Sequence, residues 1–169
     1  MIFVTVGTHE QPFNRLIECV DKLVEQGVIK EEVIIQTGFS TYEPKHCKWK
    51  KMFPYQKMLE NVEKARIVIT HGGPSTFILP LQIGKIPIVV PRQKKFDEHV
   101  NDHQVEFCRQ VSERMGTIVV LEDVANLDEI LYEYDDIKKS GECVNNNAKF
   151  CADLEYIIEE MFKGEKVNE

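Results

Sequence analysis

The sequence predicts an α/β fold of the Rossmann-like type, a mostly parallel sheet with helices on both faces. Two observations predict it. Short apolar runs alternate with segments of helical periodicity along the chain, and polar, glycine-containing loops follow several of the runs. Such an alternation implies right-handed crossovers between parallel strands. The length of 169 residues fits a single domain, which we place at 1–163, with a polar tail at 164–169.

Apolar runs of strand length predict the strands. They are rich in β-branched residues and are bounded by Gly, Pro or polar residues, as expected for strands buried on both faces of a parallel sheet. In chain order we expect strands at 2–6, 33–36, 66–70, 87–90 and 117–121.

The segments between these runs predict helices. Residues 13–26 have the clearest pattern, because apolar side chains recur on one helical face and Gly27 closes the segment. Pro74 suits the first turn of a helix at 75–83, and Pro80 should kink that helix. Further helices are expected around 58–62 and at 103–113, 123–132 and 148–162. Residues 124–163 are candidates for docking a partner, although the apolar face of 148–162 is also explained by ordinary core packing.

Composition excludes several classes of protein. Lys and Arg number 21 and Asp and Glu 28, so the net charge is −7, which argues against a nucleic-acid partner but permits a local phosphate site. The five cysteines have no C-x-x-C spacing, which favours free thiols in a reducing, cytoplasmic setting. No apolar run approaches the ~20 residues of a membrane helix, and the N-terminus has no signal-peptide pattern. The basic stretch at 45–51 is expected to be a solvated loop, with contact to anionic lipid or a partner as the alternative.

Polar loops follow four of the predicted strands. Because the carboxyl ends of parallel strands meet at one edge of a sheet, these loops should together form a ligand site. Four of the five histidines, His9, His71, His99 and His103, lie in them. A metal cluster is disfavoured, since their spacing matches no H-E-x-x-H pattern. The loops are residues 7–10, 36–40, 71–76 and 91–104.

The loop after the predicted strand at 66–70 gives the sharpest signal. Gly72 and Gly73 allow close backbone approach, and the free N–H groups of residues 75–77 are expected to point, with the helix dipole, at one anion. A pyrophosphate suits such a site, but a simple helix cap with a tight turn is an alternative. The pattern is neither the G-x-G-x-x-G fingerprint nor a P-loop, which places NAD and ATP behind other nucleotides.

Four stretches together resemble the C-terminal half of family 28 glycosyltransferases. The resemblance is strongest to split members, in which the catalytic half is a separate short chain, from capsule and exopolysaccharide synthesis and from dolichol-linked GlcNAc transfer. It covers about residues 1–121, and H-G-G-P-S-T combined with F-D-E-H-x-N-D-H-Q is its most specific part. The stretches are 3–8, 69–76, 84–92 and 96–104.

The resemblance implies the nucleotide-sugar-binding half of a GT-B enzyme. It implies an inverting transfer from a UDP-sugar, with galactose the expected sugar, to a lipid-linked acceptor, without a metal or other cofactor. It also implies a membrane-anchored partner that binds the acceptor and holds this chain at the inner face of the plasma membrane. The alternatives are a non-catalytic UDP-sugar-binding subunit and a UDP-GlcNAc transferase acting on a lipid-linked GlcNAc. A UDP-GlcNAc-type epimerase is disfavoured because it needs both halves in one chain.

The resemblance also implies roles for individual residues. Relatives carry a carboxylate for the ribose where this chain has Leu79, and we expect Glu98 to replace it, with capping of the next helix as the alternative. His99 would orient Glu98, and His9 is the candidate for acceptor-side chemistry, so these three form the expected catalytic set. The expected donor-binding residues are Gly7, Thr8, His71, Gly72, Gly73, Ser75, Thr76, Arg92, Asn101, His103 and Gln104.

Overall fold

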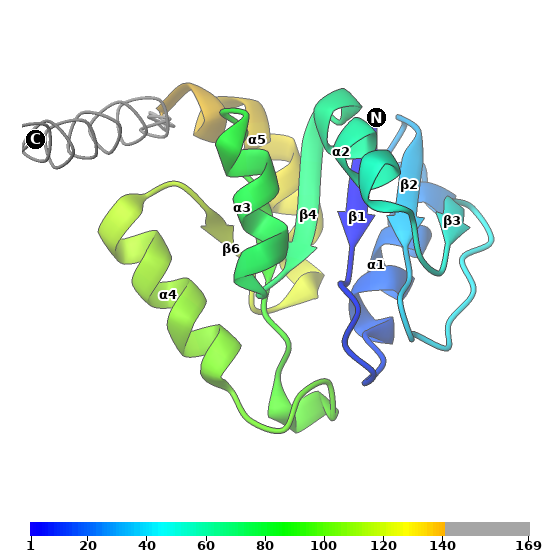
Figure 1. The fold of residues 1–169 in the computed structure, drawn as a ribbon. Coiled ribbons are helices and arrows are strands. Elements are labelled where there is room, and N and C mark those ends of the chain that lie inside the picture. The colour runs from blue at the N-terminus through cyan, green and yellow to red at the C-terminus, as the bar shows by residue number, and fades with distance from the viewer. Residues whose placement is uncertain (141–169) are drawn as a thin grey trace, which may run out of the picture.

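The computed structural model describes residues 1–140 and contains one parallel sheet (Figure 1). Its strand order is β3-β2-β1-β4-β5-β6, and every neighbouring pair is parallel. The Rossmann-like α/β prediction is therefore confirmed. The strands are β1 (Ile2–Thr5), β2 (Val33–Gln36), β3 (Lys48–Lys50), β4 (Ile67–His71), β5 (Ile88–Val90) and β6 (Val119–Val120).

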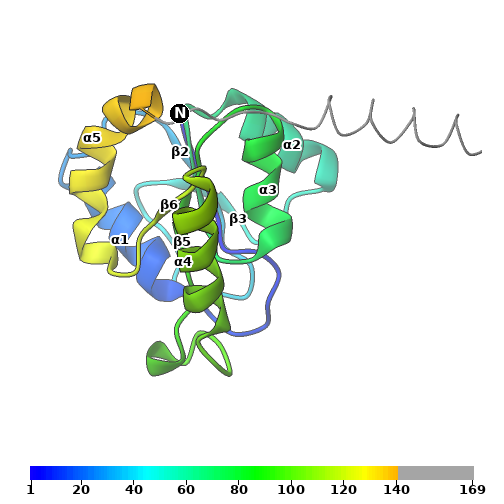
Figure 2. The same cartoon turned by 90° about the vertical axis from the view of Figure 1, so that its left-hand side faces the viewer.

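Helices cover both faces of the sheet. Figure 2 shows α1 and α5 on one side and α2 and α3 on the other. α4 packs with α3, since Cys108, Phe77 and Val89 share one buried cluster. The helices are α1 (Asn14–Glu25), α2 (Tyr55–Lys64), α3 (Pro74–Gln82), α4 (His103–Met115) and α5 (Leu127–Ser140), with 3₁₀ turns at Lys94–Phe96 and Val124–Asn126.

The core lies mainly between the sheet and the α1–α5 layer. β1 is buried along its whole length, which explains its uninterrupted apolar sequence. α1 contributes the side chains that the helical spacing predicted, among them Leu16, Ile17 and Val20, all fully buried. The five predicted strands and the helices within residues 1–140 are thus confirmed, with ends that mostly differ by a few residues. The exception is α5, which runs to Ser140, well beyond the predicted end at residue 132. The predicted helix at 148–162 and the tail at 164–169 lie outside the described residues.

One strand was not predicted. Residues 48–50, expected to be part of a solvated loop, form the edge strand β3, which pairs with β2 through the register Ile35↔Trp49. Lys48 and Lys50 are exposed while Trp49 is half-buried, so the alternation is real but too short to stand out among lysines. Charged side chains on an edge strand also discourage pairing with another sheet.

Two further expectations concern thiols and membranes. Cys19, Cys47 and Cys108, the cysteines within the described residues, are free thiols. Over the same residues, no helix combines the length and the apolar character needed to cross a bilayer.

Candidate functional site

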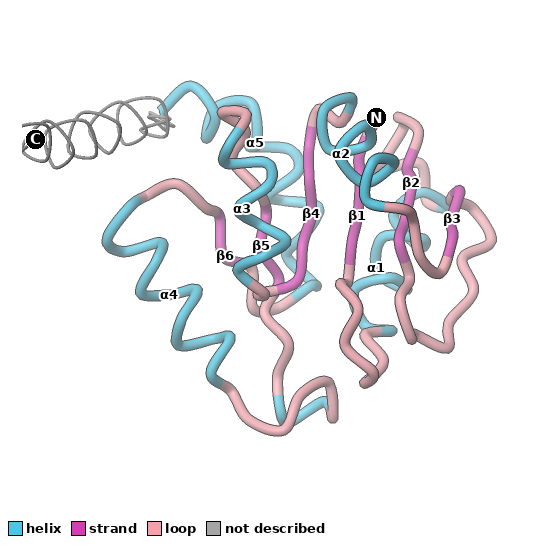
Figure 3. Tube along the Cα trace, viewed as in Figure 1, coloured by secondary structure: helices cyan, strands magenta, loops and turns pink. Residues whose placement is uncertain are grey.

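A pocket of about 560 Å³ opens at the carboxyl edge of the sheet. The loops that follow the strands gather at this edge (Figure 3). Of the expected donor-binding residues, Gly7, Thr8, His71, Ser75 and Thr76 line the pocket, and His9 lies beside them.

Part of the pocket lining is apolar and partly aromatic. It consists of Met52, Phe53, Tyr55, Met58 and Leu79. No site role was predicted for the first four residues, because apolar side chains before and within a short helix resemble core residues. A pocket lined by both apolar and polar groups suits a ligand with an aromatic base and a charged end.

His71 is the buried centre of the site. It ends β4, and its side chain fits between Gly7 and Gly73. A Cβ atom at Gly7 would lie 2.4 Å from His71 Cε1, and one at Gly73 would lie 2.3 Å from His71 Nε2. Both glycines are therefore required by a side chain of the protein itself. Burial, aided by the positive charge of Arg92, lowers the pKa of His71 to about 3, so its imidazole is neutral at physiological pH.

Gly72 has a similar neighbour. A Cβ atom there would lie 2.9 Å from Gln104 Oε1 and 3.0 Å from Cys108 Sγ. Gly72 and Gly73 were expected to let a ligand approach the backbone closely. The structure gives both glycines a packing reason as well, which a sequence motif cannot separate from a binding reason.

The N-terminus of α3 faces the pocket through Ser75 and Thr76. The expectation of three free N–H groups is wrong in part, because the N–H groups of Thr76 and Phe77 donate to the Gly73 carbonyl at 3.0 and 3.4 Å. Among residues 1–140, no side chain caps this helix. The positive end of the helix dipole is therefore available to an anion, with hydroxyl groups beside it.

The structure contradicts the predicted donor-binding role of Arg92. Its guanidinium is fully buried and donates to the carbonyl oxygens of Val6 at 2.9 Å, Gln11 at 2.8 Å and Glu98 at 3.1 Å. It also stacks 4.9 Å from the ring centre of Phe13. Burial lowers the pKa of Arg92 to about 10, which still leaves it charged. Arg92 thus holds the loops after β1 and β5 together, and its burial leaves no surface for a phosphate.

The structure also contradicts the predicted ribose-binding role of Glu98, because its carboxylate is buried as well. The carboxylate is 3% exposed and accepts two hydrogen bonds from Arg15, at 2.9 and 3.0 Å. It also accepts one from the backbone N–H of Gln93 at 3.1 Å. Its oxygens are therefore committed to the protein, so a role on the ribose does not fit. The capping alternative fails too, since the residue before α4 is Asp102.

A second layer of polar residues surrounds these buried groups. We call His71, Arg92, Glu98 and Gln104 the inner layer; all four are buried. Within it, Gln104 Oε1 accepts from the Arg92 backbone N–H at 3.2 Å. We call His9, His99, Asn101 and His103 the outer layer; these are partly or fully exposed.

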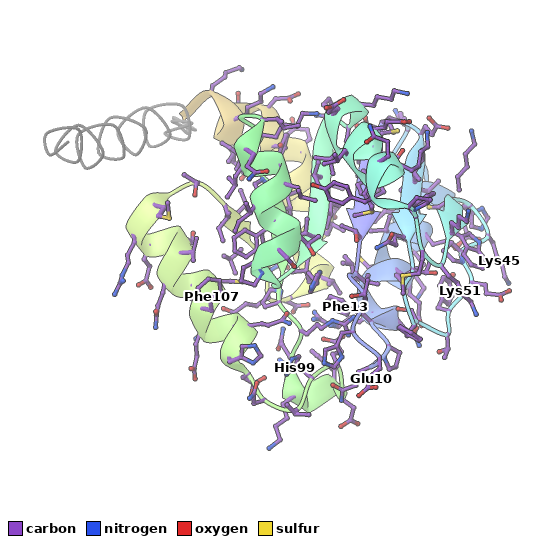
Figure 4. The ribbon with its side chains drawn as sticks, in the orientation of Figure 1. Glu10, Phe13, Lys45, Lys51, His99 and Phe107 are labelled. Atoms are coloured by element: carbon purple, nitrogen blue, oxygen red, sulfur yellow. The ribbon has the colours of Figure 1, made fainter. Side chains whose placement is uncertain are left out.

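The outer layer brings together residues far apart in sequence. The His9 and His99 ring centres are 4.9 Å apart, and those of His99 and His103 are 4.5 Å apart. Asn101 contacts the His103 ring through its amide oxygen. Figure 4 shows His99 near Glu10 of the β1 loop. Burial and the neighbouring His103 lower the pKa of His99. Within residues 1–140, no three His, Cys, Asp or Glu side chains are arranged to hold a metal ion.

Residues 1–157 match the family described as the glycosyltransferase family 28 C-terminal domain. The chain belongs to that family. The resemblance stated from the sequence is therefore confirmed, and it extends beyond residue 121.

Curated relatives match over part of the chain. Human "UDP-N-acetylglucosamine transferase subunit ALG13" is 33% identical over 119 residues, which is 65% of this chain and 10% of that protein. The mouse protein of the same name is 30% identical over 120 residues, again with 10% of its length covered. The chain thus spans about a tenth of the length of these relatives.

Solved structures share the fold. The glycosyltransferase of kitacinnamycin has a TM-score of 0.60 at 18% identity, over 86% of this chain and 36% of its own. The calicheamicin glycosyltransferase CalG4 has a TM-score of 0.60 at 14% identity, over 99% of this chain and 43% of its own. The fold is therefore that of a part of GT-B glycosyltransferases.

Proposed function

We propose that this chain is the donor-binding, catalytic subunit of a two-chain glycosyltransferase that uses UDP-GlcNAc. One observation carries the proposal: a chain of family 28 has, at the carboxyl edge of its sheet, a pocket that combines an uncapped helix N-terminus with an apolar wall. Nucleoside diphosphates need both features, a surface for the base and a positive site for the phosphates.

The lining residues suggest how the donor binds. The base would pack against Phe53 and Met58, and the diphosphate would face Ser75 and Thr76 at the start of α3. The sugar would then reach the outer layer, where Asn101 and the imidazoles offer directional hydrogen bonds to hydroxyl groups. Of the inner layer, only His71 lines the pocket, whereas Arg92, Glu98 and Gln104 would hold these loops in place without touching the donor.

Transfer with inversion needs a base on the acceptor hydroxyl. His9 is our candidate within this chain, because it lies at the pocket and beside His99. The base could equally come from the acceptor-binding chain. The α3 dipole would stabilise the leaving UDP, so we propose that no metal ion is needed.

We now propose N-acetylglucosamine as the donor sugar in place of the galactose that the sequence resemblance implied. Galactose rests on the resemblance to capsule enzymes, whereas the curated relatives are named as subunits of a UDP-GlcNAc transferase. That name also supports a heteromeric enzyme. We therefore propose a lipid-linked GlcNAc acceptor, bound by a membrane-anchored partner that keeps this chain at the cytoplasmic face of the membrane.

Calorimetry with UDP tests the donor pocket. Ser75→Glu places a carboxylate at the start of α3, where it favours the helix but repels a diphosphate. We expect UDP affinity to fall at least about tenfold, which corresponds to about 1.4 kcal/mol, with an unchanged melting temperature. Ser75→Gln is the matched neutral control and should bind nearly as well as the wild type. Equal affinity of all three proteins would contradict the proposed diphosphate site.

A transfer assay tests catalysis and the donor. The chain, co-expressed with its partner, should transfer label from UDP-GlcNAc to a lipid-linked acceptor in the presence of EDTA, and much more slowly from UDP-galactose. Preference for UDP-galactose would restore our first expectation. UDP binding without any transfer would favour the non-catalytic alternative.

A further inference from the structure

A second pocket, of about 430 Å³, lies beside the donor pocket. The loop after β2 and the end of β3 form it, and Met52 lines both pockets. The β2 loop also touches the β1 loop, since a Cβ at Gly38 would lie 2.7 Å from the Gly7 carbonyl oxygen. A ligand in the second pocket would therefore be a direct neighbour of the donor.

Three aromatic side chains line this pocket. Phe39 is 56% exposed, and Tyr42 and Trp49 are half-buried. An exposed phenylalanine at the tip of a short loop has no role in the core. Aromatic rings of this kind provide flat apolar surfaces on which the C–H face of a sugar can pack.

The pocket is preformed by a buried carboxylate. Asp21 is 1% exposed and accepts a hydrogen bond from the Tyr42 hydroxyl at 2.8 Å. It also accepts from the backbone N–H groups of Lys45 and His46, at 2.9 and 2.8 Å. The Tyr42 hydroxyl is thereby used, so the tyrosine contributes a fixed ring to the pocket. Preorganisation of this kind lowers the entropic cost of binding.

Lysine residues lie at the pocket and close to it in the sequence. Lys51 lines the pocket, and Lys45 and Lys50 are exposed nearby in the sequence (Figure 4 labels Lys45 and Lys51). Lys48 is paired with Glu32, but within residues 1–140 these other three lysines have no acidic partner. Glu43 also lines the pocket and offsets one of these charges, so three lysines face one glutamate. In a chain of net charge −7, this local excess of cations favours an anionic ligand.

We propose that this pocket binds a sugar phosphate, as the glycosyl phosphate end of an acceptor whose lipid is held by the membrane-anchored partner. The sugar would pack on Phe39 and Trp49, Glu43 would accept a hydroxyl hydrogen bond, and Lys51 would hold the phosphate. A concave pocket of this size suits one small ligand better than a flat membrane surface. The acceptor role rests on the proposed function, whereas sugar-phosphate binding itself does not.

Trp49 makes a direct test possible, because it is the only tryptophan in the chain. Its fluorescence is followed while N-acetylglucosamine 1-phosphate is added, in parallel with N-acetylglucosamine alone and inorganic phosphate alone. We expect a saturable change at millimolar concentration for the sugar phosphate, with at least about tenfold weaker binding of either half.

Variants assign the signal to the pocket. Lys51→Gln and Phe39→Ala should each weaken sugar-phosphate binding about tenfold, while Lys57→Gln, an exposed lysine on α2, should not. All three variants should keep the wild-type UDP affinity measured by calorimetry. That result separates the two sites, since Ser75→Glu should lose UDP but keep the Trp49 response.

Several outcomes would overturn the proposal. They are an absent Trp49 response, equal affinity for inorganic phosphate, displacement of the sugar phosphate by UDP, or an equal response to anionic vesicles without sugar phosphate. If the Trp49 response is present but UDP binding is absent, the sugar-phosphate site stands and the proposed donor function fails.

Discussion

The inner and outer layers of the carboxyl edge contain similar residue types but do different work. In the inner layer, the Arg92 guanidinium donates to backbone carbonyl groups, and the Glu98 carboxylate accepts from Arg15. The His71 side chain fills the space beside two glycines. In the outer layer, the ring of His99 contacts the rings of both His9 and His103, and these side chains are at least partly exposed. Polar residues in strand-end loops are therefore not equally available to a ligand. The inner layer mainly stabilises the loops, and the outer layer is exposed and can contact a ligand.

The largest effect should come from removing the inner cation. Arg92→Met leaves the carbonyl groups of Val6, Gln11 and Glu98 without their donor in a buried place. At about 1–3 kcal/mol for each unsatisfied group, we expect a loss of at least about 3 kcal/mol in the free energy of unfolding. Urea denaturation measures it. Arg109→Met, which changes an exposed arginine paired with Glu122, is the control and should cost much less. Similar losses in the two variants would abolish the distinction between the layers.

His71 should make stability depend on pH. Its pKa is about 3 in the folded protein and about 6.5 unfolded, so between these values the unfolded chain binds the extra proton. The free energy of unfolding should fall as the pH drops from 6.5 towards 3, by up to about 1.4 kcal/mol per unit from this residue. His71→Asn should flatten that slope in urea titrations at several pH values. An unaltered slope in the His71 variant would show that this imidazole is not held neutral by the fold.

The glycines around His71 allow a smaller, sharper test. Gly73 has φ of −81°, which alanine adopts without strain, so Gly73→Ala tests only the clash with His71. Overpacking typically costs about 1–3 kcal/mol, and thermal denaturation should detect it. In the double variant Gly73→Ala/His71→Ala, most of the Gly73 penalty should disappear relative to His71→Ala alone. If the penalty persists there, Gly73 serves the ligand or the backbone and not the imidazole.

The outer layer should give the smallest change in stability. His103→Ala removes an exposed side chain and should alter the free energy of unfolding by less than about 0.5 kcal/mol. We expect transfer in the two-chain assay to fall nonetheless, because the lost group faces the proposed sugar site. If sugar transfer is unchanged and the free energy of unfolding falls, His103 has a structural role and does not contact the sugar.

The sequence by itself predicted most of the fold. Periodicity and breakers placed β1, β2, β4 and β5 and the helices between them, because buried parallel strands are continuous apolar runs and amphipathic helices repeat at a fixed spacing. The edge strand β3 was not predicted, because it depends on pairing with β2 in the folded protein and its short Lys-Trp-Lys sequence has almost no local signal.

For the site, the sequence determined which loops meet and which residue types they carry. The tertiary structure decided which of these side chains face solvent. Nothing in the stretch from Arg92 to Gln104 reveals that Arg92 reaches the carbonyls of the β1 loop, or that Glu98 pairs with Arg15 from α1. Burial of a charge depends on partners more than 80 residues away, and that information exists only once the sheet has assembled.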